Sequence, residues 1–178
     1  MKNIFIVLSF LWVSPLLAQK YMSRSAEVYF LSDKDAVEIV EATNNQVGAV
    51  IDLENGAIAF QIQMRAFHFN IALMEEHFNE NYVESYRYPK ATFRGSFVDL
   101  PKDLSTPQIL TVAGTMEFHG VKKDMEIEVS LSLKESILQG DAKFDLLCSD
   151  FDIEIPKIVA DKLANTIQVT VKASLTKL

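Results

Sequence analysis

The chain has 178 residues, of which 49% are apolar and 10% aromatic, so it is long enough for one domain with a hydrophobic core and too apolar for a disordered chain. It contains 17 Lys and Arg residues and 24 Asp and Glu residues, which gives a formal net charge of −7. A nucleic-acid-binding protein needs clustered basic residues to neutralise phosphates, and the sequence has no such cluster. This class of partner is therefore excluded.

Residues 1–18 have the three-part pattern of a secretory signal peptide. Lys2 precedes an apolar run over Ile4–Val13, and Ala18 is a small residue at the expected cleavage site. The run is short for a membrane span of about 30 Å, so a permanent membrane anchor is the weaker alternative. We expect export to the periplasm and a mature domain over residues 19–178. Cleavage would remove Lys2, so the mature domain would carry a net charge of −8, compared with −7 for the whole chain.

Most of the remaining chain alternates apolar and polar side chains, which is typical of antiparallel strands with one buried face. Met125–Leu133 and Ile167–Leu175 show this period of two most clearly, and turn residues such as Asn55-Gly56 separate the runs. Regularly spaced strands of this kind predict a sandwich or a closed barrel. The predicted strands are Glu27–Leu31, Val37–Ala42, Val47–Asp52, Ala57–Met64, Ala91–Val98, Gln108–Phe118, Met125–Lys134, Gly140–Leu147 and Thr166–Thr176.

One segment, Leu73–Tyr86, breaks the strand period. Pro89 follows it and is expected to stop a helix. Before this segment the apolar phase shifts at Arg65-Ala66, which predicts a bulge or a corner. The segment itself is predicted to be a helix with three apolar side chains on one face, spaced four apart: Met74, Phe78 and Tyr82.

Two sequence blocks resemble the YceI-like, polyisoprenoid-binding proteins. The first is His77–Tyr82 leading into Tyr88–Gly95, and the second is Leu110–Lys123; the stretch Asp150–Ile155 also fits. The resemblance covers about Ser25 to Leu178. It implies an all-β fold, an extended eight-stranded antiparallel barrel of lipocalin-like shape with one short helix near its opening. It also implies that the protein binds long isoprenoid or amphiphilic chains inside the barrel. We expect a binding protein that is not an enzyme.

The inward phases of the strands provide the candidate lipid-binding residues. We expect these side chains to hold the lipid chain: Phe60, Ile62, Phe67, Phe69, Phe93, Phe97, Gly114, Met116 and Phe118. Met74, Phe78 and Tyr82 of the helix are expected to border the entrance. Gly114 either leaves space or lets the sheet coil. An eight-stranded barrel can also be filled by its own side chains, so a non-binding interaction module with a solid core is an alternative.

The acidic composition bears on the ligand. A negatively charged surface repels anionic head groups, so we expect a neutral head, as in an isoprenoid quinone, on the bound long-chain lipid. No other cofactor is expected. The sequence leaves open whether the chain forms a homodimer.

An enzyme of unknown reaction that uses His77, Glu76 or His119 is a further alternative. No metal-binding histidine spacing, nucleophile elbow or phosphate-binding loop is present in the sequence, so we expect neither a catalytic nor a metal site. The acidic residues Asp150, Asp152 and Glu154 could suggest calcium, but they lack the twelve-residue loop pattern and are interpreted as a solvated face. The only cysteine, Cys148, is interpreted as part of the core.

Overall fold

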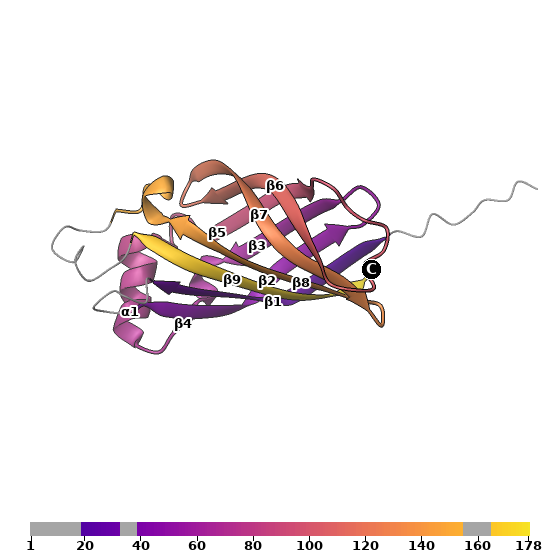
Figure 1. Cartoon of the computed structure of the whole chain (residues 1–178). Helices are drawn as coiled ribbons and strands as arrows, with labels where there is room; N and C mark the ends of the chain where they lie inside the picture. Colours follow the sequence, from indigo (N-terminus) through magenta and orange to yellow (C-terminus); the bar gives the residue numbers. More distant parts are fainter. Residues whose placement is uncertain (1–18, 33–38, 155–164) are drawn as a thin grey trace, which may run out of the picture.

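The structure, a computed structural model, describes residues 19–32, 39–154 and 165–178 (Figure 1). The predicted signal peptide over residues 1–18 lies outside the described residues, as does the first part of the predicted strand Val37–Ala42. Figure 1 shows an elongated barrel with α1 (Ala72–His77) at one end and the C-terminus at the other.

Eight antiparallel strands form the barrel, and its closure leaves no long free edge. Neighbours run in the order β1-β9-β8-β7-β6-β5-β3-β2, and β2 pairs again with β1. The predicted eight-stranded antiparallel barrel is therefore confirmed. A two-residue strand, β4 (His68–Phe69), is added beside Ala42 and Thr43. The barrel strands are β1 (Lys20–Ser32), β2 (Glu41–Asp52), β3 (Ala57–Gln63), β5 (Lys90–Phe97), β6 (Gln108–Phe118), β7 (Val121–Lys134), β8 (Ile137–Leu147) and β9 (Thr166–Lys177).

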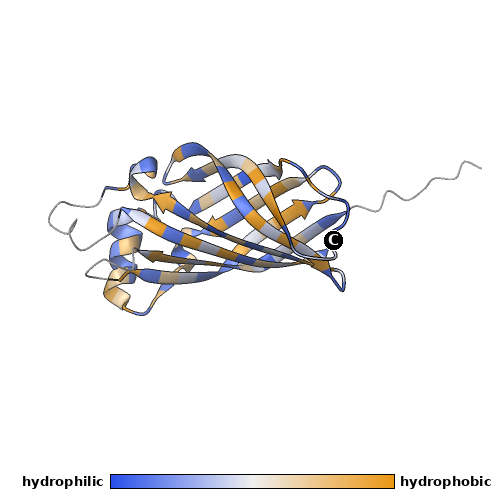
Figure 2. Ribbon diagram, in the orientation of Figure 1, coloured by the Kyte–Doolittle hydropathy of each residue, from blue (hydrophilic) through white to orange (hydrophobic). Residues whose placement is uncertain are grey.

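Alternation of apolar and polar residues along these strands gives the barrel its apolar interior (Figure 2). The end opposite α1 is filled by three leucines that are fully buried: Leu131, Leu138 and Leu175. Leu138 lies directly opposite Leu175 across the β8–β9 pair. These three side chains are therefore packed out of contact with water.

Two hairpins are tighter than predicted. Only His119 and Gly120 lie between the paired residues Phe118 and Val121. Their φ values, 50° and 79°, are both positive, as a two-residue type I′ turn requires. The β7–β8 turn likewise needs only Glu135 and Ser136, at φ 49° and 68°. As a result β7 and β8 begin earlier than the predicted starts at Met125 and Gly140.

The predictions for β1 and β2 were wrong in two respects, because inward polar residues interrupt the apolar pattern. β1 starts earlier than predicted, and the predicted strands that end at Ala42 and start at Val47 are one continuous strand. β1 begins at Lys20 and not at Glu27, and its register with β2 shifts between Ser23 and Ala26. β2 begins at Glu41 and includes Asn44, which is fully buried. Nδ2 of Asn44 donates to the backbone oxygen of Gln63 at 2.8 Å, so burial leaves that amide nitrogen hydrogen-bonded.

The predicted single helix over Leu73–Tyr86 was wrong in its extent and form. α1 ends at His77 and continues as one π-helical turn, η2 (Phe78–Tyr82). The predicted corner at Arg65-Ala66 is confirmed as a 3₁₀ turn, η1 (Met64–Ala66). None of the helices in the described part of the chain is both long and apolar enough to cross a membrane.

A hydrogen-bond network joins β1 and β2 near α1. The Tyr29 hydroxyl donates to Glu41 Oε2 at 2.6 Å, and Asn70 Nδ2 lies 3.2 Å from the other carboxylate oxygen. This hydrogen bond, together with partial burial and the charge of Glu41, raises the pKa of Tyr29 to about 12. Because the folded-state pKa lies above the ordinary value of about 10, the contact stabilises the fold below pH ~10 and is lost as pH rises through 12.

Alkaline titration of tyrosine absorbance tests this contact. Subtracting the curve of the Tyr29→Phe protein from that of the wild type should leave one transition near pH 12. In the Glu41→Gln protein the same transition should move down toward pH ~10, because the charged acceptor is gone. A wild-type transition already at the ordinary value would show that Tyr29 does not donate to Glu41.

Candidate functional site

A cavity of about 130 Å³ lies inside the barrel, and only apolar atoms face it. All eight barrel strands contribute to its wall, together with η1 and η2. Because each strand turns alternate side chains inward, neighbouring strands bring their apolar faces to this common space. The site has no polar group to orient a ligand, so it suits a hydrocarbon chain.

The structure brings most of the predicted lipid-binding residues together around the cavity. The predicted residues that line it are Phe60, Ile62, Phe67, Phe78, Phe93, Met116 and Phe118. Phe97 is buried in the core but does not line the cavity. Phe69, Met74 and Tyr82 are half-buried at the α1 end and lie outside the cavity wall.

Gly114 does not line the cavity, and the space expected at this position is absent. It lies opposite Gly95 where β5 and β6 approach closely. A Cβ atom on Gly114 would lie 2.5 Å from the backbone oxygen of Arg94, and 2.7 Å from both Gly95 Cα and Phe93 Cζ. Of the two expected roles, allowing the sheet to coil is the one that fits, and the Phe93 ring occupies the space above the glycine.

Several lining residues were not among the predicted ones. On β1 they include Val28 and Phe30, and on β9 Ile167, Val169 and Val171. The alternation of β9 was visible in the sequence. It shows which face is buried but not which stretch of that face borders an empty space.

An aromatic cluster of Phe30, Phe67, Phe69 and Phe78 covers the α1 end of the cavity. The Phe30 and Phe78 rings stack with centroids 5.6 Å apart, and the Phe69 ring is 5.0 Å from Phe78. Such ring pairs add stability beyond the burial of their area. The cavity therefore lies between this aromatic cluster and the leucine-filled end.

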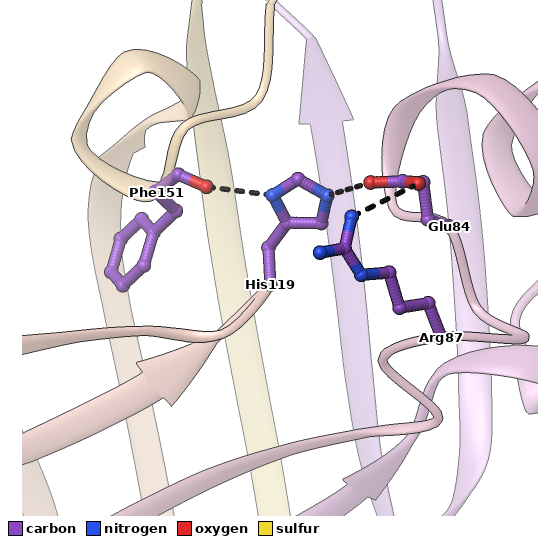
Figure 3. A network of polar contacts seen from close by, with 4 residues as sticks. All are labelled: Glu84, Arg87, His119 and Phe151. Atoms are coloured by element: carbon purple, nitrogen blue, oxygen red, sulfur yellow. Dashed lines mark hydrogen bonds and ion pairs between the residues drawn. The ribbon is translucent and has the colours of Figure 1, made fainter.

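The histidines are separated in the structure. His68 and His77 are exposed, whereas His119 is buried with both ring nitrogens engaged (Figure 3). Its Nδ1 lies 2.9 Å from the backbone oxygen of Phe151, and its Nε2 lies 3.1 Å from Glu84 Oε2. Both ring nitrogens are therefore occupied by contacts within the protein.

The described residues contain no group of three or more His, Cys, Asp or Glu that could hold a metal ion. Asp150 forms an ion pair with Lys123. Asp152 and Glu154 are exposed, as expected for a solvated face.

Cys148 is buried at the start of η3 (Cys148–Phe151), and burial raises the pKa of its thiol to about 11. At pH ~8 we expect it to react with a disulfide reagent at least about a hundredfold more slowly in the folded protein than in urea, because little thiolate forms. Cys148 is the only cysteine in the sequence, so the absorbance of the thiol released from a coloured disulfide reagent reports this site alone. Equal rates in both states would place the thiol at the surface.

Comparison with known proteins agrees with this architecture. The model of the YceI-like domain family matches residues 23–175, whereas no sequence among the curated proteins matches the chain. A polyisoprenoid-binding domain from Saccharophagus degradans, implicated in plant cell wall breakdown, is 15% identical, with a TM-score of 0.76 over 90% of this chain and 99% of that one. BcnA of Burkholderia cenocepacia is 12% identical, with a TM-score of 0.68 over 85% and 96% of the two chains. A YceI protein of Campylobacter jejuni is also 12% identical, with a TM-score of 0.54 over 97% and 92%. The family model covers most of the sequence and the described barrel, and the chain therefore belongs to the YceI-like domain family.

Proposed function

We propose that this protein binds an isoprenoid or a similar amphiphilic lipid by burying its chain inside the barrel, and that it carries this lipid in the periplasm after export. The observation that carries the proposal is the wholly apolar cavity inside the barrel. A solved structure of the same fold is described as a polyisoprenoid-binding domain, which supports the same ligand class. The cavity counts against a module with a solid core.

The size of the cavity limits how the lipid binds. At about 130 Å³ it is close to an engineered cavity of ~150 Å³ that accepts benzene, so it holds roughly six carbon atoms. At ~0.3 kcal/mol per heavy atom this would contribute only ~2 kcal/mol. About twenty buried carbons would give ~6 kcal/mol and about forty ~12 kcal/mol, near nanomolar affinity. Tight binding therefore requires the space to extend when the chain enters.

The space extends more easily toward α1 than toward the C-terminal end. Leu131, Leu138 and Leu175 are fully buried, so moving them would disrupt the packing of three strands. Phe69 and Phe78 of the aromatic cluster are only half-buried, and Phe78 is carried by the short η2 turn. We therefore place the entrance at the aromatic cluster, with the head group of the lipid outside it.

A neutral head group suits this arrangement best. The cavity has no cationic side chain to neutralise a phosphate, and the mature domain would carry a net charge of −8. An isoprenoid quinone fits these conditions better than an isoprenoid phosphate.

Native mass spectrometry of protein purified from the periplasm tests the ligand and the export together. We expect a protein mass that lacks residues 1–18 and a bound, phosphorus-free isoprenoid lipid. A co-purified phosphorylated lipid would contradict the neutral head. A protein free of lipid that also takes up no apolar probe would contradict the binding function.

A catalytic function has weaker support. The two ring nitrogens of His119 are occupied, and Glu76 and His77 are exposed neighbours on α1. Successive residues of a helix point in different directions, so these two side chains do not converge on one substrate atom.

A further inference from the structure

His119 joins three separate parts of the chain at the α1 end of the barrel (Figure 3). It lies at the tip of the β6–β7 hairpin, next to Phe151 of η3 and to Glu84 of the segment that follows η2. The side chain of His119 is 9% exposed, so water offers its ring nitrogens little alternative. The two contacts therefore account for both ring nitrogens.

Both partners of the ring are hydrogen-bond acceptors. A backbone oxygen only accepts, so Nδ1 donates to Phe151. A neutral ring would then turn the lone pair of Nε2 toward a carboxylate oxygen of Glu84, which is repulsive. Glu84 is 41% exposed, and Arg87 Nη1 lies 3.8 Å from its other oxygen. Both ring nitrogens therefore face acceptors, an arrangement that a doubly protonated ring satisfies by donating from each nitrogen.

The other groups around the ring do not replace Glu84 as its counter-ion. Tyr88 packs edge-on against His119 with centroids 4.6 Å apart, and the Arg87 guanidinium lies 5.0 Å from the centre of the Tyr88 ring. Two acidic residues of the adjoining elements have cationic partners of their own, Glu117 with Lys122 and Asp150 of η3 with Lys123.

Glu84 is coupled through the backbone to the cavity wall. Val83 N donates to the Phe78 oxygen at 2.9 Å, and Ser85 N donates to the Asn79 oxygen at 2.8 Å. Glu84 itself has a φ of 44°, a left-handed conformation that a residue with a side chain keeps only when its surroundings hold it. The contact with His119 thus helps to hold the turn that places Phe78 against the cavity.

We propose that His119 is a positioning residue, whose doubly protonated ring holds Glu84 and, through it, η2 and Phe78 at the entrance of the cavity. When Nε2 loses its proton, the ring no longer donates to Glu84, and the segment around η2 is released. The claim that His119 controls the entry of lipid rests on the proposed lipid binding. The protonation state of His119 and the release of the segment around η2 do not depend on it.

Nuclear magnetic resonance of the lipid-free protein tests the protonation state. At pH about 5.5 the ring ¹⁵N shifts of His119 should show protons on both nitrogens, and the Nε2 proton should be lost as pH rises. Over the same range the exchange protection of the Val83 and Ser85 amides, corrected for intrinsic rates, should fall about tenfold. Val98, which bonds to Thr111 outside this region, should keep its protection. A neutral His119 ring at pH about 5.5 would overturn the proposal.

The Glu84→Gln variant separates this role from a merely structural one. A glutamine side chain accepts from a protonated Nε2 and donates to a neutral one, so the protection of Val83 should no longer depend on pH. The matched control is Glu80→Gln, which removes an exposed charge from η2 and should keep the wild-type pH profile. A wild-type profile in the Glu84→Gln protein would contradict the proposal.

Uptake of all-trans-retinol, a fluorescent isoprenoid alcohol, distinguishes this role from the binding function. Uptake should accelerate with pH in the wild type and stay constant in the Glu84→Gln protein. A pH-independent wild-type rate, despite falling Val83 protection, would contradict the control of entry. If retinol fails to bind at any pH while the His119 and Val83 signals behave as expected, the binding function is wrong and the positioning role of His119 stands.

Discussion

Replacing Gly114 with alanine should destabilise the barrel by about 3 kcal/mol and lower its Tm by about 10 °C. The added Cβ would lie 2.5 Å from the Arg94 oxygen and 2.7 Å from Gly95 Cα, and these are backbone atoms that cannot rotate away. Relief requires β5 and β6 to separate where they pair, or the Phe93 ring to leave its position. Urea unfolding, followed by far-ultraviolet circular dichroism, measures the change in the free energy of unfolding.

Gly48→Ala is the matched control for this change. Gly48 also lies in a barrel strand, but a Cβ there would have the Gln61 oxygen as its nearest neighbour at 3.9 Å, an ordinary contact. The same substitution should therefore be neutral or stabilise the protein by up to about 1 kcal/mol, because alanine restricts the unfolded chain. Equal midpoints for both variants would show that the close approach of β5 and β6 is not required.

Alternation in the sequence predicts strands well where the inward face is continuously apolar. The bounds of β6 agree with the prediction at both ends, and those of β3, β5 and β9 agree within a residue. The prediction fails where an inward position is polar, as at Asn44. The partner that satisfies this amide is the backbone of Gln63, which belongs to another part of the chain. A local pattern cannot indicate such a distant hydrogen bond.

The cavity could be predicted only in part. Phe93 and Phe97 occupy equivalent inward positions on β5, yet Phe93 lines the cavity and Phe97 does not. The difference comes from where each ring lies along the barrel and from how the facing strands fill the space there. The empty volume is a small remainder after eight strands have packed their side chains, so periodicity cannot give it.

The surroundings of His119 could not be predicted from the sequence. The residue lies between the predicted strands Gln108–Phe118 and Met125–Lys134, and the structure places it in the two-residue turn between β6 and β7. Its contacts with Glu84 and Phe151 span more than thirty residues in either direction, so only the folded barrel brings them together.

Replacing Ala142 with phenylalanine should weaken retinol binding at least about tenfold while the protein stays folded. Ala142 lines the cavity from β8 and faces Val129 on β7 and Val171 on β9. A phenyl ring is about as large as the ligand that a cavity of this volume accepts, so the new side chain should occupy the space itself. Fluorescence titration with retinol measures the affinity, and urea unfolding checks the fold.

Ala59→Phe is the control for the added ring. Ala59 lies between Ile58 and Phe60, which both line the cavity, so the alternation of β3 turns its own side chain to the outside. This variant should bind retinol as the wild type does. If the Ala142→Phe protein is folded and retains wild-type affinity, the lipid chain does not enter this cavity. If both variants lose affinity equally, the loss does not come from filling the barrel, and the ligand binds on the outer surface instead.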